Sequence, residues 1–251
     1  MIERLLRTAK EGPYKWFYGN WDLFLEVVRN PSSKIVLDAD GILVNSTKPV
    51  FTNYERESGV KVKASEIDRW DFLTEVSKRA DLPQDKIDHA EDGWFDANVL
   101  GQAKKYPFMK LAVDSMISHA GAENVYVLTS RNPNLRDSTE RTLFDQYPKI
   151  LPENLLIRQN KYVPSNEFKA GCLWWLAQTA PSVIFIDDSQ DFIKAALDAK
   201  IPNLLAINIP QGVTWPGFSN ENLVVIKRYP QSAQSLIPFW YYYNKALGKL
   251  P

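Results

Sequence analysis

The feature that most constrains the fold is Asp38-Ala39-Asp40, which directly follows the apolar run Ile35-Val36-Leu37. A short, β-branched apolar run is typical of a strand buried on both faces. The two aspartates therefore stand at the carboxyl end of a strand, where open α/β sheets bind ligands. One residue apart, they leave an extended strand on the same side. Such close like charges indicate a metal site or an acid/base pair, the alternative being two solvated aspartates.

Two further apolar runs also end in polar residues. Val183-Ile184-Phe185-Ile186 precedes Asp187-Asp188, and Val125-Tyr126-Val127-Leu128 precedes Thr129-Ser130-Arg131. Parallel strands would bring all three ends to one edge of a sheet, so that acids, hydroxyls and an arginine share one cleft. Each polar residue could instead be a helix N-cap, since Asp and Ser are favoured there. Three such strand ends in one chain favour the shared cleft.

The order and spacing of these residues resemble the haloacid dehalogenase (HAD) superfamily of phosphotransferases, over roughly residues 34 to 210. The resemblance implies an α/β fold: a three-layer, Rossmann-like core with a parallel sheet, and a small helical cap inserted after the first strand. The residues that match the four motifs are Asp38-Ala39-Asp40-Gly41, Thr129, Lys169 near a helix start, and Asp187-Asp188.

The resemblance implies an HAD-type phosphoric monoester hydrolase that forms an aspartyl-phosphate intermediate on Asp38. Asp40 would protonate the leaving oxygen and then deprotonate water, so its pKa should lie closer to neutrality than that of Asp38. Dehalogenating members lack an acid at position 40, because halide leaves unprotonated. Asp40 therefore favours phosphate ester hydrolysis or transfer over dehalogenation. It argues less strongly against a mutase, because mutases carry both acids.

By the same resemblance, phosphoryl oxygens would be held by Thr129, Ser130 and Lys169. The cofactor would be Mg²⁺, since the family needs positive charge between a carboxylate and a phosphate. Its ligands would be the Asp38 side chain, the Asp40 carbonyl, and a carboxylate of Asp187 or Asp188, with the choice between the last two left open.

The interval between the first and second motifs is too long for one crossover helix, so a cap must be inserted there. We expect an N-terminal helical extension at 1–33, a core at 34–46 and 104–251, and a helical cap at 47–103. Amphipathic spacing predicts helices within the cap, the first of them over Val50 to Ser58 and ended by Gly59.

The cap resembles, more loosely, that of 5'(3')-deoxyribonucleotidase-like members. Its aromatic residues Trp70, Phe72 and Trp94 could stack a nucleobase or could simply form the cap core. Arg131 could bind a phosphate or sugar, because guanidinium matches oxyanion geometry, or it could be a solvated helix start. The expected substrate is a small phosphomonoester, with a nucleotide as one candidate.

Two alternatives remain open. A nucleic-acid end phosphatase would need a basic groove interleaved with aromatics, and the sequence shows no strong signal of one. A non-catalytic binding or regulatory protein of this fold would lose Asp38 or Asp40, and both are present.

Composition limits the fold size, the partners and the cellular location that we expect for the chain. Its 251 residues, formal net charge of +0 and 45% hydrophobic content fit one α/β core with a small insertion, without a drive toward nucleic acid or anionic membrane. The single Cys172 excludes an internal disulfide, and two histidines exclude a zinc cluster. With no apolar stretch near membrane-span length and no secretory signal, we expect a cytoplasmic protein. The aromatic N- and C-terminal segments could dock on each other or form a dimer surface.

Overall fold

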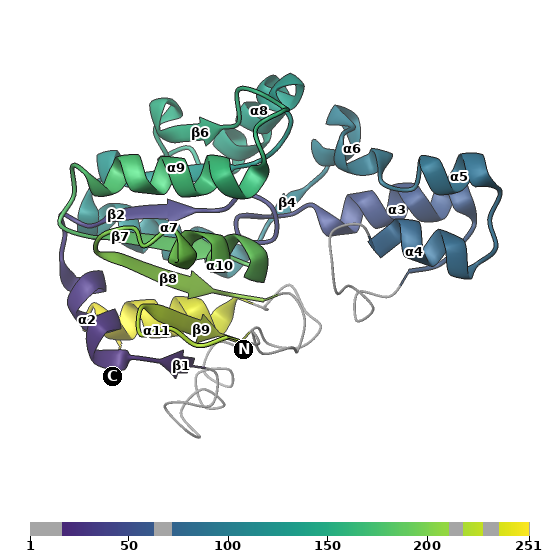
Figure 1. Ribbon diagram of the computed structural model, residues 1–251. Helices are drawn as coiled ribbons and strands as arrows, with labels where there is room; N and C mark the ends of the chain where they lie inside the picture. The colour runs from purple at the N-terminus through teal and green to yellow at the C-terminus, as the bar shows by residue number, and fades with distance from the viewer. Residues whose placement is uncertain (1–16, 63–71, 211–217, 228–235, 251) are drawn as a thin grey trace.

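The computed structural model describes residues 17–62, 72–210, 218–227 and 236–250. Its centre is a seven-stranded sheet (Figure 1). The strands are β1 (Phe17–Gly19), β2 (Lys34–Leu37), β5 (Val125–Thr129), β6 (Leu155–Ile157), β7 (Val183–Asp187), β8 (Leu204–Asn208) and β9 (Leu223–Ile226). Their order is β1-β9-β8-β7-β2-β5-β6, and all neighbours are parallel except β1 and β9. The predicted α/β architecture with a largely parallel sheet is confirmed.

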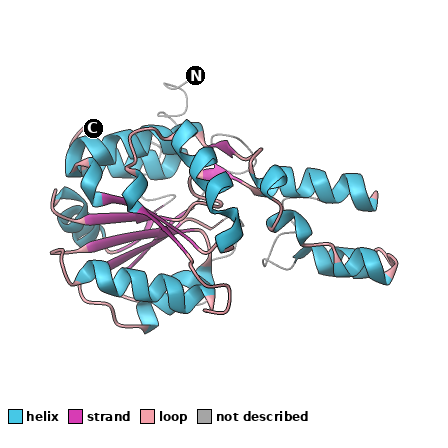
Figure 2. Cartoon of the chain, turned by 90° about the horizontal axis from the view of Figure 1, so that it is seen from above, coloured by secondary structure: helices cyan, strands magenta, loops and turns pink. Residues whose placement is uncertain are grey.

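Helices cover both faces of the sheet, as Figure 2 shows from above. One face carries a buried apolar cluster that includes Leu37 and residues of α2, α7 and α11, and the other a cluster that includes Val36 and residues of α9 and α10. No helix in the described residues is long and apolar enough to cross a bilayer. The helices are α2 (Trp21–Arg29), α7 (Pro107–Ala120), α8 (Arg136–Gln146), α9 (Ser165–Ala177), α10 (Gln190–Asp198) and α11 (Ile237–Ala246), with short 3₁₀ turns η3 (Ala122–Asn124), η4 (Pro133–Leu135) and η5 (Pro152–Asn154).

The predicted helical insertion follows β2 and projects from the sheet (Figure 1). A two-stranded antiparallel ribbon, β3 (Val44–Asn45) with β4 (Lys104–Lys105), joins it to the core. Its helices enclose an apolar cluster of their own, which also receives Leu135 from the core. They are α3 (Thr47–Ser58), α4 (Phe72–Arg79), α5 (Gln84–Asp88), η2 (Asp92–Trp94) and α6 (Ala97–Leu100).

The expectation of a wholly helical N-terminal segment is wrong in part. Phe17–Gly19 form β1, which pairs antiparallel with β9 at the edge of the sheet. Gly19 has φ of +129°, and a Cβ atom there would lie 2.6 Å from the carbonyl oxygen of Leu223. Only glycine permits both this backbone conformation and this approach between the strands. The following helix α2 agrees with the prediction.

The aromatic C-terminal helix α11 docks within the chain, on α7 and α2. The ring of Tyr242 lies 5.3 Å from that of Phe17 and 6.1 Å from that of Trp21. Tyr242 and Tyr243 are buried. The described aromatic residues of the two segments thus pack against each other, in agreement with the docking alternative.

Candidate active site

Three adjacent strands end in polar side chains at one level of the sheet. Asp187 on β7 pairs with Asn208 on β8, and Asp38 follows the β2 residue that pairs with Ile186. Val36 and Phe185, two positions before Asp38 and Asp187, belong to the apolar cluster beneath α9 and α10. Because side chains alternate along a strand, the polar residues face the same helices.

Lys169 on α9 joins two of these acids. Its Nζ atom lies 2.7 Å from Asp38 Oδ1 and 2.7 Å from Asp187 Oδ2, and the side chain is 1% exposed. The ammonium also lies 4.1 Å from the ring centroid of Phe192. Burial alone would lower the pKa of Lys169, but the two carboxylates outweigh it and raise that pKa. The lysine is therefore a fixed buried cation between the acids.

A third acid completes a cluster. Oxygen atoms of Asp38, Asp187 and Asp188 all lie within 4.8 Å of one another. Burial raises the pKa of Asp38 and Asp187, and nearby carboxylates raise both further against the pull of Lys169. One lysine cannot balance three clustered acids, and carboxylate oxygens are the ligands that Mg²⁺ prefers. The donor set and its excess negative charge thus fit a hard divalent cation.

Asp40 has a different partner. Arg131 donates hydrogen bonds from Nε to Asp40 Oδ2 at 2.9 Å and from Nη2 to Oδ1 at 2.6 Å, while Nη1 donates to Thr139 Oγ1 at 3.2 Å. Burial acts to raise the pKa of Asp40, but the guanidinium outweighs it and holds this pKa below its usual range. The predicted order is therefore wrong for this arrangement: the pKa of Asp38 is raised and that of Asp40 is lowered.

The two hydroxyl residues expected to bind phosphate lie at the end of the neighbouring strand β5. Thr129 ends β5, which pairs directly with β2, and is 1% exposed. Its hydroxyl accepts a hydrogen bond from the Arg131 backbone N–H at 3.3 Å. Ser130 follows and is half-buried. The structure thus brings Thr129, Ser130 and Arg131 to the edge that carries the acids.

Of the predicted base-stacking residues, Phe72 and Trp94 belong to or pack against the apolar cluster of the cap. Phe72 is 2% exposed and stacks on Phe51 at 6.2 Å between ring centroids. Trp94 packs against the same apolar cluster. Trp70 falls outside the described residues. The cap-core alternative accounts for the position of Phe72, and a stacking role stays a prediction for Trp70 and Trp94.

Both chain segments that lead into the cap are fastened to the end of α8. Gln146 Nε2 donates to the Ala103 carbonyl at 2.9 Å, and Gln146 Oε1 accepts from the Lys105 N–H. Tyr147, the next residue, donates its hydroxyl to the Leu43 carbonyl at 2.6 Å. We call these two linker segments, at Leu43 and at Ala103–Lys105, the hinge of the cap. The three hydrogen bonds attach the hinge to the core.

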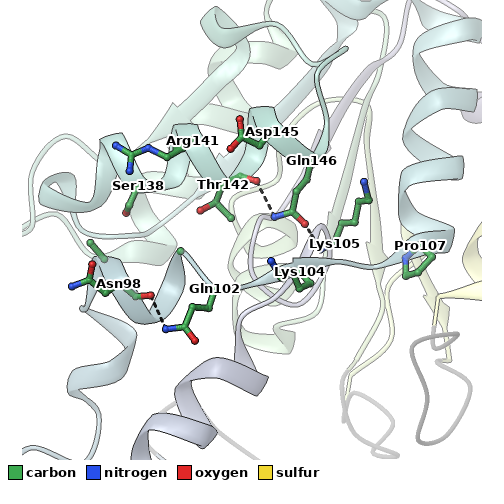
Figure 3. A pocket seen from close by; sticks show the side chains of 12 residues that line it. Asn98, Gln102, Lys104, Lys105, Pro107, Ser138, Arg141, Thr142, Asp145 and Gln146 are labelled. Carbon is green, nitrogen blue, oxygen red and sulfur yellow. Dashed lines mark hydrogen bonds between the residues drawn. The ribbon is translucent and has the colours of Figure 1, made fainter.

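A cavity of about 740 Å³ lies beside this hinge, between α6, β4 and α8. Figure 3 shows Lys104, Lys105, Arg141 and Gln146 around it. None of the clustered acids lines it. It is thus a surface feature of the cap–core junction and is separate from the acidic centre.

No protein-family model matches this chain, and no curated protein matches it in sequence. Among solved structures, a haloacid dehalogenase-like family hydrolase from Streptococcus pneumoniae has a TM-score of 0.49 and 20% identity, over 72% of this chain and 87% of its own. A HAD-superfamily hydrolase of subfamily IA, variant 1, from Geobacter sulfurreducens has a TM-score of 0.49 and 14% identity, over 84% and 98%. Likenesses at this level do not decide a reaction, for which the residues of the site are the guide.

Two features of this edge were not predicted from the sequence, and only one of them lacks a local signal. The pairing of Arg131 with Asp40 joins residues far apart in the chain, and Thr139 on α8 completes it. Asn208 did carry a signal: it ends the apolar run Leu204–Ile207, as the acids end theirs. The same strand-end rule would have placed it at this edge.

Proposed function

We propose that the chain is a Mg²⁺-dependent phosphatase that hydrolyses a small phosphomonoester through an aspartyl-phosphate on Asp38. The observation that carries this proposal is the Lys169 bridge between Asp38 and Asp187 at the carboxyl edge of the sheet. A nucleophilic carboxylate needs a nearby cation to approach a phosphate dianion, and Lys169 is a buried cation in contact with it.

In the first step, an Asp38 oxygen attacks phosphorus and the bond from phosphorus to the leaving oxygen breaks. Asp40 gives its proton to that oxygen, so an alcohol departs rather than an alkoxide. Lys169 offsets the charge of the nucleophile and the phosphoryl oxygens, while Thr129 and Ser130 donate hydrogen bonds to those oxygens.

In the second step, water attacks phosphorus and the bond between phosphorus and Asp38 breaks. Asp40, now a carboxylate, accepts the proton of that water. Inorganic phosphate leaves, and both acids return to their starting states. The same side chain thus acts first as an acid and then as a base.

Arg131 opposes the protonation that Asp40 needs at the start of this cycle. Asp40 must be protonated before the first step, yet its hydrogen bonds with Arg131 keep its pKa low. A guanidinium binds a phosphoryl group in the same two-pronged way as a carboxylate. We infer that a bound substrate draws Arg131 from Asp40 to its own oxygens and so allows Asp40 to take up a proton.

The residues that would hold Mg²⁺ are Asp38, Asp187, Asp188 and the Asp40 carbonyl. Three of them bring carboxylate oxygens within 4.8 Å of one another. When bound, the ion supplies positive charge to the phosphoryl oxygens, in addition to that of Lys169.

The proposed substrate is a small phosphomonoester, with a nucleotide as one candidate class. A nucleotide would need exposed aromatic faces over the site, and burial removes Phe72 from that role. A panel of nucleoside monophosphates, sugar phosphates and a 3'-phosphorylated oligonucleotide separates the substrate classes. A clear preference for nucleotides would support the 5'-nucleotidase-like branch, and a flat response across the panel would remove it.

The reaction itself is tested with p-nitrophenyl phosphate. We expect hydrolysis that requires Mg²⁺, stops on addition of EDTA and returns when Mg²⁺ is restored in excess. Hydrolysis that continues unchanged after complete chelation would remove the metal from the proposal. Failure to hydrolyse any member of the panel would contradict the phosphatase assignment.

A further inference from the structure

We propose that Asn208 is a positioning residue of the metal site, an inference that rests on the function proposed above. Its amide Nδ2 donates hydrogen bonds to the carbonyls of Asp187 at 3.1 Å and Asp188 at 3.2 Å. These are the two consecutive residues whose carboxylates belong to the acidic cluster. Asn208 thus holds the backbone from which both carboxylates project.

The surroundings of Asn208 make this hold rigid. The residue is 0% exposed and ends β8, in register with Asp187. The backbone N–H of the next residue, Ile209, also donates to the Asp187 carbonyl, at 2.9 Å. A strand end and a side chain therefore bind the same short segment, which limits how far Asp187 and Asp188 can move relative to Asp38.

The other end of the amide suggests a second contact. Asn208 Oδ1 is buried and has no hydrogen-bond partner among the described residues. Turning the amide over would place oxygen against the carbonyls of Asp187 and Asp188, so Nδ2 must remain where it is. A buried acceptor is costly to leave unpaired, and bound Mg²⁺ usually keeps several waters. If Mg²⁺ were bound, Oδ1 would be an acceptor for one of these waters.

The chain contains a matched control. Asn154 is also buried, and its Nδ2 also donates to two carbonyls, those of Ala122 at 3.0 Å and Val125 at 3.1 Å. Val125 begins β5, so this amide lies at the amino ends of the parallel strands, away from the acids at their carboxyl ends. Both asparagines donate to two backbone carbonyls. The carbonyls that Asn208 contacts belong to proposed metal ligands, and those that Asn154 contacts do not.

The test is isothermal titration of metal-free protein with Mg²⁺ and with Mn²⁺, in the absence of substrate. We expect Asn208→Leu and Asn208→Ser to raise the Kd about tenfold or more, in line with the loss of other groups that support metal ligands. Asn154→Leu should leave the Kd within about twofold of wild type. Asn208→Leu and Asn154→Leu should both lower the Tm measured in EDTA, because each removes a pair of buried hydrogen bonds.

The outcomes separate this inference from the proposed function. A wild-type chain that binds neither ion overturns both. A wild-type chain that binds, with folded Asn208 variants of equal Kd, overturns the role of Asn208 alone. An equal loss of affinity in Asn154→Leu would show a general effect of destabilisation and would also overturn it. Asn208→Ser, which adds no apolar bulk, decides the question if Asn208→Leu does not fold.

Discussion

The guanidinium of Arg131 donates two hydrogen bonds to the carboxylate of Asp40, at 2.9 and 2.6 Å. Arg131 also donates a hydrogen bond to Thr139 on α8 and is 7% exposed, so its side chain is buried and fixed in position. Arg131 contributes most to lowering the pKa of Asp40, the proposed acid/base, ahead of Ser46 and Lys169. The pair therefore favours the ionised form of Asp40, and a group that competes for Arg131 would favour its protonation.

Arg131→Gln should alter the pH dependence of turnover. Without the guanidinium the pKa of Asp40 rises, so the protonated acid persists to higher pH. The alkaline limb of the kcat/KM profile should move upward by about one to three pH units, the usual effect of an adjacent opposite charge. KM should also rise, since a phosphate contact is lost.

The control for this variant is Arg136→Gln, which removes a partly exposed arginine that pairs with Glu140 on the surface of α8. Its profile should match that of wild type. An alkaline limb that stays in place in Arg131→Gln would contradict the assigned link between Arg131 and Asp40.

Lys169→Met should destabilise the metal-free protein strongly. It removes the cation between Asp38 and Asp187 and leaves these two buried acids without their ion-pair partner. Breaking a buried ion pair from one side costs about 3–5 kcal/mol, a loss that urea unfolding in EDTA would measure. Lys194→Met, which breaks an exposed pair with Asp198, should change stability little. Equal losses in the two variants would contradict the buried role of Lys169.

Gln146→Ala should loosen the hinge of the cap. Two hydrogen bonds from α8 to the segment at Ala103 and Lys105 disappear, while the acids are untouched. We expect faster amide hydrogen exchange at residues 103–106 and a KM several-fold higher, at nearly unchanged metal affinity. Gln102→Ala is the control, because its side chain donates to the carbonyl of Asn98 in the preceding helix α6 and not to the linker segments of the cap. Exchange at 103–106 that matches wild type would show that Gln146 does not hold the hinge.

Cys172 should react slowly with alkylating reagents. Burial raises the pKa of its thiol to about 11, and the thiolate is the reactive form. The rate of modification by iodoacetamide, followed by mass spectrometry, should therefore keep rising with pH past 9. A rate that levels off near the pKa of an ordinary thiol would contradict the raised pKa of Cys172.

The sequence predicted the central strands well because their burial is written into local composition. Runs such as Ile35–Leu37 and Val183–Ile186 are apolar on both faces, and polar residues mark where they end. Because parallel strands have their carboxyl ends on the same side of a sheet, the sequence also predicts that Asp38, Thr129 and Asp187 lie at one edge.

What the sequence did not predict depends on partners distant in the chain. Phe17–Gly19 has a helix-like local pattern, but it becomes a strand because β9 offers an open edge for pairing. The relative pKa values of Asp38 and Asp40 depend on which cation reaches which acid, and Arg131 lies far from Asp40 in sequence. Spacing within a segment contains no information of this kind.

The most direct measurement of the central claim is the rate at which Asp38→Asn hydrolyses p-nitrophenyl phosphate with saturating Mg²⁺. An amide cannot replace the carboxylate as nucleophile, so we expect kcat to fall by about 10³-fold or more. Circular dichroism should show that the variant is folded, since the change also removes a buried negative charge. A folded Asp38→Asn protein that retains the wild-type kcat would contradict the proposal that Asp38 carries the phosphoryl group.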